Sequence, residues 1–460
     1  MVDIPLDRPL RAAAALHPYL APALRHAGWF GVFLVLAPLI GPHGYGLFML
    51  ALGGVAIAEA LLAETTTQAL VNLSAVEERH WSTALVTMIA GGAVIWLALR
   101  AAAPLLDALV GEPGFPDMFR SLAILPLLGG LSAVPVASLR REGRQGPLIA
   151  ASVAGFAAGG GAALSLAWAG AGAWSLVAQI IVQRLVECVV LWGTLGERVG
   201  LSWSAQHFAD LVEALDGRAF AAIRPAVRRY APILIVGLRL GPTAAGLYML
   251  AAQLTEALAE IGLAGDSDTT QREAVQRACR VLLPAVLASG LLAVALPPLV
   301  DLRWWGVVLP AQILLLGAIP AVVGYVYKAS AKNDAREPYW QAIEALGGVA
   351  IAALLAPDGL VVVAAGSMLW LSVMALAGLW QARGNLAIQW RRLGVEMLRP
   401  CGGALLAGTF LFFLATPIGL ALAPVPALSL LTGGAWLIYL VVRGDPAGAG
   451  ARAVRLAPEI

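Results

Sequence analysis

The feature that most constrains this chain is the recurrence of apolar runs about 20 residues long, the length that an α-helix needs to cross a hydrocarbon core of about 30 Å. Hydrophobic residues make up 60% of the chain and charged residues only 13%, whereas a soluble domain has roughly half and a quarter. The sequence therefore predicts an all-α polytopic membrane protein. We expect fourteen spans, at 16–40, 45–65, 82–105, 118–139, 147–170, 174–195, 219–240, 244–263, 279–300, 309–328, 339–356, 359–380, 400–419 and 425–443.

Two stretches about 200 residues apart repeat each other around a Gly-Pro pair. Gly41, Pro42 and Gly46 recur as Gly241, Pro242 and Gly246, and the apolar residues that follow recur with them. Each copy reads as a helix, a turn and a second helix. Because six spans separate the copies, both enter the membrane in the same direction. The repeat predicts two six-helix lobes related by a pseudo-twofold axis along the membrane normal, with two further helices at the C-terminus.

Basic residues outside the spans are distributed unevenly between the two sides. If the N-terminus is cytoplasmic, only Arg100, Arg120, Arg239 and Arg303 fall on the outer side, and short cytoplasmic loops are enriched in Lys and Arg. We expect both termini in the cytoplasm. The expected division is a cytoplasmic segment (1–15), an N-terminal lobe (16–195), a cytoplasmic linker (196–218), a C-terminal lobe (219–381), a cytoplasmic loop (382–399), helices 13 and 14 (400–443) and a cytoplasmic tail (444–460).

Several arginines fall where membrane is expected. The helix from Tyr230 to Leu240 is only about 16 Å long at 1.5 Å per residue, which is too short to cross the hydrocarbon core. Arg228 and Arg229 are therefore expected to lie within the membrane. The same arithmetic places Arg25 and His26 at depth, and Arg224 lies one turn before Arg228. Such residues normally face a cavity or a partner. Guanidinium groups make forked hydrogen bonds to phosphate, so we expect a diphosphate site; the alternative is arginines that snorkel to the interface.

Two further spans carry polar stripes at helical spacing. One holds Gln179, Gln183 and Glu187 beside Arg184, and the other holds Gln253, Glu256 and Glu260. Glu256 is a candidate for neutralising an arginine or carrying a coupling proton, and a plain helix–helix ion pair is the alternative. Arg184 and Glu187, one turn apart, are expected to pair locally. Glu59 is expected near the cytoplasmic end of its span.

Several stretches together resemble the Wzx-type polysaccharide flippases of the multidrug/oligosaccharidyl-lipid/polysaccharide (MOP) exporter superfamily. The resemblance rests on IGPHGYGLFMLAL at 40–52 and LGPTAAGLYMLA at 240–251, with support from VASLRREGRQGPL, GAGAWSLVAQIIVQ, RWWGVVLPAQILLLG and GAWLIYLVV. It implies movement of an undecaprenyl-diphosphate-linked oligosaccharide from the cytoplasmic to the periplasmic leaflet of the bacterial inner membrane, for exopolysaccharide or O-antigen synthesis. The partners implied are this substrate, membrane lipid and other polysaccharide-assembly proteins, with no nucleic acid.

Other function classes stay open on the sequence. A drug/cation antiporter or a peptidoglycan-precursor flippase of the same superfamily would share the architecture, and a membrane-embedded glycosyltransferase or ligase is a more distant alternative. No Walker-type glycine loop is present. The three cysteines match no metal-ligand spacing. We expect no catalytic residue, no cofactor and no metal, with Gly41, Pro42, Gly241 and Pro242 as structural turns.

Overall fold

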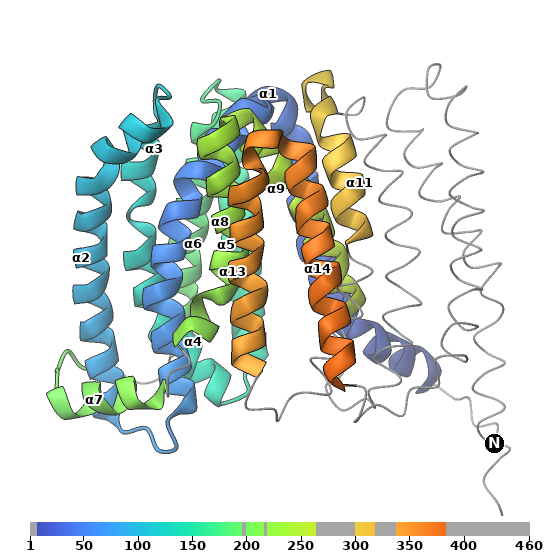
Figure 1. Cartoon of the computed structure of the whole chain (residues 1–460). Helices are drawn as coiled ribbons and strands as arrows, with labels where there is room; N and C mark the ends of the chain where they lie inside the picture. Colours follow the sequence, from blue (N-terminus) through green and yellow to red (C-terminus); the bar gives the residue numbers. More distant parts are fainter. Residues whose placement is uncertain (1–6, 196–198, 216–218, 264–299, 318–336, 383–460) are drawn as a thin grey trace, which may run out of the picture. The chain divides into compact units, whose positions relative to one another are not determined.

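The computed structural model describes residues 7–195, 199–215, 219–263, 300–317 and 337–382, and every regular element among them is helical (Figure 1). The α-helices are α1 (Asp7–Asn72), α2 (Glu78–Val110), α3 (Phe115–Leu122), α4 (Leu125–Arg141), α5 (Gln145–Trp168), α6 (Trp174–Thr194), α7 (Ala205–Ala214), α8 (Ala219–Leu240), α9 (Pro242–Leu263), α11 (Val308–Leu316), α13 (Glu337–Leu355) and α14 (Leu360–Ala382). Two short 3₁₀ helices are η1 (Leu302–Val307) and η2 (Ala356–Asp358).

The membrane character predicted from the sequence is confirmed. Within the described residues, seven stretches are long and apolar enough to cross a membrane, beginning with Gly28–Asn72 and Glu78–Val110. Helix α8 is not among the seven, and it is the helix that carries Arg224, Arg228 and Arg229. The expected spans 279–300, 400–419 and 425–443, and most of 309–328, lie outside the described residues.

The chain forms two compact units. The large unit comprises residues 30–249 and 334–370, and the small unit comprises residues 1–29, 250–333 and 371–460. Helices α2 to α8 and α13 thus belong to the large unit, and helix α11 to the small one. The predicted boundaries of the two lobes stay a prediction.

Both Gly-Pro pairs of the repeat form the expected turns. Gly41 has φ 71° and interrupts α1 with a kink, while Gly241 has φ 88° and separates α8 from α9. Positive φ values favour glycine because it has no Cβ, and proline suits the first position of the helix that follows. The repeat in sequence is therefore a repeat in backbone conformation.

The two turns also pack against each other within the large unit. A Cβ added to Gly46 would collide with the carbonyl oxygen of Pro242, and one added to Gly246 would collide with that of Pro42. His43 and Thr243, which are equivalent in the repeat, lie within hydrogen-bonding distance at 3.4 Å. This reciprocal contact is the arrangement that a twofold relation between the copies produces.

The packing of the first six helices centres on α4 and α6. Helix α5 packs along α6, and α4 contacts α2, α5 and α6 (Figure 1). Pro135 inside α4 has no N–H to offer the carbonyl of Leu131, four residues earlier. The indole Nε1–H of Trp192 on α6 donates to that carbonyl at 3.0 Å. A carbonyl that proline leaves free within the membrane is thus satisfied by a neighbouring helix, as lipid surroundings require.

Two elements differ from the sequence expectation. The span expected at 118–139 is divided into α3 and α4, with Pro126 in the first turn of α4. The linker expected at 196–218 contains α7, which lies crosswise at the end of the bundle where α2 begins (Figure 1). Its buried residues, His207 and Leu211, are one turn apart, while Phe208 and Val212 on the next face are exposed. That amphipathic pattern is typical of a helix lying along a surface.

Candidate functional site

A cavity of about 840 Å³ lies within the large unit, between α1, α4, α6 and α8. Helix α1 contributes the segment after its kink, from Leu52 to Asn72, and Leu215, just after α7, completes the lining. This volume is in the range of pockets that bind small molecules, about 300–1,000 Å³. Its charged lining residues are Glu59, Glu64, Arg140, Arg184 and Arg229. Three arginines face two glutamates, so the lining is net positive by one charge.

A network of four side chains, joined by ion pairs and a hydrogen bond, includes Glu59 and Arg184 of the cavity lining and extends behind them to Gln183 and Glu187. Arg184 Nη2 lies 3.3 Å from Glu59 Oε1, and Arg184 Nη1 lies 3.3 Å from Glu187 Oε2. Gln183 Nε2 donates to Glu187 Oε1 at 2.9 Å. The Glu59 and Glu187 side chains are 12% and 14% exposed, whereas that of Arg184 is 41% exposed. Two largely buried carboxylates therefore hold one guanidinium that still reaches the cavity.

Glycines on neighbouring helices make room for this network. A Cβ on Gly129 of α4 would lie 2.7 Å from Glu59 Oε1. On α5, a Cβ on Gly159 would lie 2.9 Å from the Cβ of Gln183, and a Cβ on Gly155 would lie 2.5 Å from the Cγ of Glu187. Small residues let helices approach closely in membranes. Here they also leave space for polar side chains between the helices.

Arg140 lines the end of the cavity nearest the α4–α5 loop, and Arg141 follows it outside the lining. Arg140 lies 3.7 Å from Glu64, and both side chains are partly exposed. Arg141 Nη1 donates to the carbonyls of Leu70 at 2.9 Å, Val71 at 3.1 Å and Leu73 at 2.6 Å. These are carbonyls at the C-terminal end of α1, which lack partners within the helix. Arg141 therefore fixes the end of the helix that carries Glu59 and Glu64.

Helix α8 forms the opposite wall. Ala221, Ala222, Pro225, Ala226 and Arg229 line the cavity, followed by Tyr230. These positions recur every three to four residues, so they occupy one face of the helix. The guanidinium of Arg229 lies 5.7 Å from the ring centroid of Tyr230, within the range of a cation–π contact. The small residues before Arg229 leave this wall open.

The structure brings some of the expected site residues together and separates others. Arg229, Arg184, Gln183 and Glu187 lie at the cavity or in the network beside it. The expected local pair of Arg184 and Glu187 is confirmed. Arg228 is exposed and Arg224 is half-buried, and neither lines the cavity. Gln179 lies on α6, the helix that carries Arg184, and its backbone carbonyl faces Gly159.

The remaining expected residues belong to the small unit. His26 is half-buried on the first part of α1, and the side chain of Arg25 lies outside the described part of the chain. Gln253 and Glu256 are half-buried on α9. Their roles at a shared cavity stay predictions.

Glu59 is the residue that sequence reasoning undervalued. The sequence analysis places it near the end of its span, because the apolar run ends at about residue 65. Helix α1 instead continues to Asn72, and Glu59 is buried against α4 and α6. A usable signal was available: an acidic residue within a run of alanine and leucine, together with an arginine, Arg184, in the middle of the expected span 174–195.

Comparisons with known proteins agree on the architecture. Residues 35–262, just under half of the chain, match a family described as "Polysaccharide biosynthesis protein". An inward-facing multidrug resistance MATE family transporter of the MOP superfamily is similar, with a TM-score of 0.60 at 16% identity, over 81% of this chain and 95% of that one. The lipid II flippase MurJ, in an inward closed conformation, gives a TM-score of 0.66 at 11% identity, over 92% and 97%.

A MATE crystal structure in the straight conformation matches less well, with a TM-score of 0.52 at 15% identity, over 84% of this chain and 96% of that one. The search of curated proteins found no match. At such identities the structural likeness identifies the fold, and the substrate has to be argued from the cavity.

Proposed function

We propose that the chain is a member of the multidrug/oligosaccharidyl-lipid/polysaccharide exporter superfamily, whose fold it shares, and that it is a flippase for a lipid-linked oligosaccharide in polysaccharide biosynthesis. The substrate class is an undecaprenyl-diphosphate-linked oligosaccharide, moved from the cytoplasmic to the periplasmic leaflet of the bacterial inner membrane. The observation that carries the proposal is the cavity between α1, α4, α6 and α8, where Arg140, Arg184 and Arg229 face Glu59 and Glu64.

The chemistry of this cavity suits a diphosphate. An arginine at bilayer depth costs roughly 2.5–3.5 kcal/mol even on the milder insertion scale, so Arg184 and Arg229, which lie within helices that line the cavity, need a role there. Arginine presents a planar fork that binds phosphate oxygens through paired hydrogen bonds. A diphosphate brings at least two negative charges to a lining that is net positive by one. The sugars would meet the small and polar residues of α8 and α1.

The ion pairs of Arg184 give the mechanism a defined first step. With no substrate, Glu59 and Glu187 neutralise Arg184 and hold it in position. An arriving phosphate competes with these carboxylates for the guanidinium. Alternating access of the two lobes would then expose the headgroup to the other side, with the polyprenyl tail remaining in lipid.

The test is a flipping assay in proteoliposomes that contain a lipid-linked oligosaccharide. Exposure of the sugar on the outer leaflet should depend on the protein, and Arg229→Ala or Arg184→Ala should reduce the rate at least tenfold. Arg184→Lys should restore little, because an ammonium lacks the fork. Arg239→Ala is the matched control on α8, since Arg239 is exposed and outside the cavity lining.

Two variants test the cations that the sequence analysis favoured. If Arg25 or Arg228 binds substrate, Arg25→Ala or Arg228→Ala should also slow flipping. Unchanged transport by Arg184→Ala and Arg229→Ala would overturn the cavity assignment. No protein-dependent flipping at all would overturn the flippase proposal and favour the antiporter, for which transport of cationic drugs should be measured in the same liposomes.

A further inference from the structure

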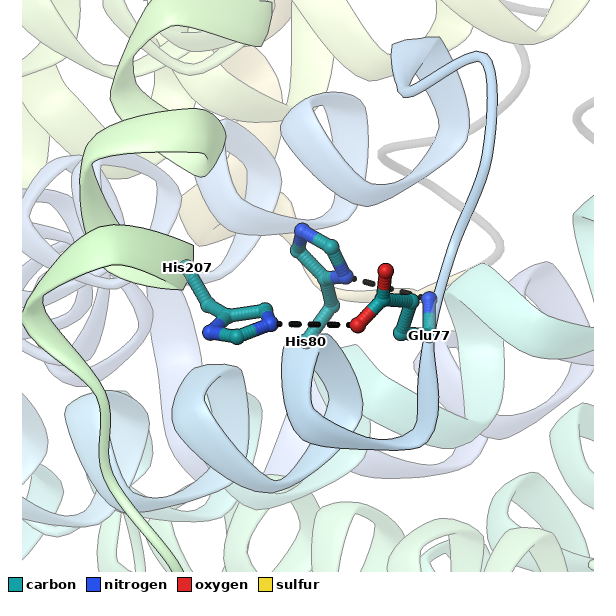
Figure 2. Close-up of side chains that lie close together, drawn as sticks. All are labelled: Glu77, His80 and His207. Atoms are coloured by element: carbon teal, nitrogen blue, oxygen red, sulfur yellow. Dashed lines mark hydrogen bonds and ion pairs between the residues drawn. The ribbon is translucent and has the colours of Figure 1, made fainter.

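A cluster of two histidines and two carboxylates lies at the end of the large unit where α2 begins, outside the cavity lining. Glu77 is the residue before α2, His80 lies in its first turn, and His207 comes from α7 (Figure 2). Both histidines are buried, with 6% and 9% of their surface exposed. Their rings are 4.5 Å apart between centroids, and one ligand atom from each of Glu77, His80 and His207 lies within 4.8 Å of the others.

Hydrogen bonds around the cluster favour particular forms of the two rings. His80 Nε2 lies 3.3 Å from Asp210 Oδ2, and an ionised carboxylate can only accept, so Nε2 carries the proton. The other nitrogen of His80, Nδ1, then presents its lone pair, and it accepts a hydrogen bond from the backbone N–H of Glu77 at 3.0 Å. A histidine oriented by a carboxylate in this way is the usual arrangement behind a metal ligand.

His207 can present a lone pair to the same place. Its Nδ1 lies 2.8 Å from Ser204 Oγ, and its Nε2 lies 3.3 Å from Glu77 Oε2. The serine hydroxyl can donate or accept. When it accepts from Nδ1–H, Nε2 turns a lone pair toward the Glu77 carboxylate, and that contact is unfavourable unless a cation lies between them. Figure 2 shows His80, His207 and Glu77 converging on this space from two elements.

We propose that Glu77, His80 and His207 bind a divalent transition-metal ion, with Zn²⁺ as the best match. The ligands are His80 Nδ1, His207 Nε2 and a Glu77 carboxylate oxygen, and Asp210 and Ser204 orient the two rings. Zn²⁺ binds imidazole nitrogen and carboxylate oxygen at about 2.0–2.2 Å, so tetrahedral ligand atoms are about 3.3–3.5 Å apart. The 3.3 Å separation of His207 Nε2 and Glu77 Oε2 already meets this spacing.

Binding requires a small local change at the start of α2. The metal replaces the hydrogen bond from the Glu77 N–H to His80 Nδ1. The three ligand atoms, which now lie within 4.8 Å of one another, also move closer together. The Glu77 side chain is 71% exposed, so an ion can arrive from water and keep water in its fourth position. The bound ion joins α7 to α2. Since Leu215, next to the end of α7, lines the cavity, the metal fixes an element that adjoins it.

The experiment measures zinc on the full-length protein, purified with an affinity tag that contains no histidine and stripped with a chelator. Titration against a chromophoric zinc indicator, with elemental analysis after desalting, should give one Zn²⁺ per chain. His80→Gln, His207→Gln and Glu77→Gln should each weaken binding at least tenfold. Asp210→Asn should weaken it roughly 10- to 100-fold by releasing the His80 ring. His43→Gln is the matched control, because His43 is an exposed histidine outside the cluster.

Three outcomes decide the proposal. One zinc per chain that is lost in the cluster variants and kept in His43→Gln supports it. No zinc uptake by the unaltered protein overturns it, and the cluster is then held together by its hydrogen bonds alone. Equal zinc content in all variants also overturns it and points to another site. Size-exclusion profiles distinguish loss of ligands from loss of fold, and Asp210→Asn, which retains all three ligands, provides the readout if a histidine variant misfolds.

Discussion

The ion pair of Glu59 and Arg184 links helices α1 and α6 within the large unit. The two side chains come from α1 and α6, and Glu187 supports the same guanidinium from one turn away. Removing one partner of a buried ion pair costs more than the pair contributes, because a charge is left without compensation. Arg184 is partly exposed to the cavity and keeps Glu187, which reduces that cost.

Glu59→Gln should therefore lower stability by about 1–3 kcal/mol, below the 3–5 kcal/mol of a fully buried pair. Glu59→Gln combined with Arg184→Gln should recover part of this loss, giving a coupling energy of about 1 kcal/mol or more in a double-mutant cycle. Thermal unfolding of the protein and its variants in detergent measures these changes in stability. The control is Glu64→Gln, whose partner Arg140 is 3.7 Å away and 39% exposed; a change as large as that of Glu59→Gln would contradict the assignment.

A carboxylate in the α4–α5 loop supplies a pH dependence. Arg144 and Ser138 donate hydrogen bonds to Glu142, which lower its pKa from the ordinary value of 4.5. Because the pKa is lower in the folded state, the resulting stability is present above about pH 4.5 and is lost as the pH falls through the folded value. Glu142→Gln should flatten the pH dependence of unfolding below about pH 4.5. Unfolding curves that keep their slope in this variant would assign the dependence to other groups.

At the scale of elements, α4 depends on α6 for one of its carbonyls. Pro135 leaves the Leu131 carbonyl without its helical donor, and Trp192 supplies the replacement at 3.0 Å. Trp192→Phe keeps an aromatic ring and removes the donor. It should lower stability by about 1–3 kcal/mol, the cost of an unsatisfied buried carbonyl. Thermal unfolding checks this, and Pro135→Ala in the same background should rescue it by restoring a donor within α4.

The contact between the two repeat turns predicts a matched set of glycine variants. Gly46→Ala and Gly246→Ala each place a methyl group against a carbonyl oxygen of the other turn. Overpacking of this kind costs about 1–3 kcal/mol, and the two variants should behave alike because the contact is reciprocal. Gly161→Ala on α5 is the control, since nothing lies within 4 Å of the added group. It should be neutral or stabilising, as alanine favours a helix; equal losses at all three positions would contradict the argument.

At the scale of the whole molecule, the distribution of basic residues predicts the orientation in the membrane. Ser74 lies in the loop before α2 and Asp117 lies in α3, and both are exposed. In a background without the native cysteines, Asp117→Cys should react with a membrane-impermeant maleimide in spheroplasts. Ser74→Cys should react only after the membrane is permeabilised. The reverse pattern would invert the topology and, with it, the proposed direction of transport.

Much of this architecture could be predicted from the sequence, because hydropathy and turn chemistry are local properties. The helical class follows from the apolar runs, since lipid leaves a spanning backbone few alternatives to internal hydrogen bonds. The turns at Gly41 and Gly241 follow from residues that favour a positive φ before a proline. The break between α3 and α4 and the surface helix α7 were missed, because an interruption within one apolar run and a ten-residue amphipathic segment give weak signals.

The sequence by itself determined that the chain is a multi-pass membrane protein and that its two Gly-Pro turns repeat, and it predicted that arginines lie at membrane depth, because each of these depends on neighbouring residues along the chain. Only the tertiary structure decided which charges meet. It selected Arg229 for the cavity lining, paired Arg184 with Glu59, and joined Glu77 to His207 across 130 residues. Those contacts depend on how far each helix extends, how it is rotated and where glycines let its neighbours approach, and these are set by packing across the whole unit.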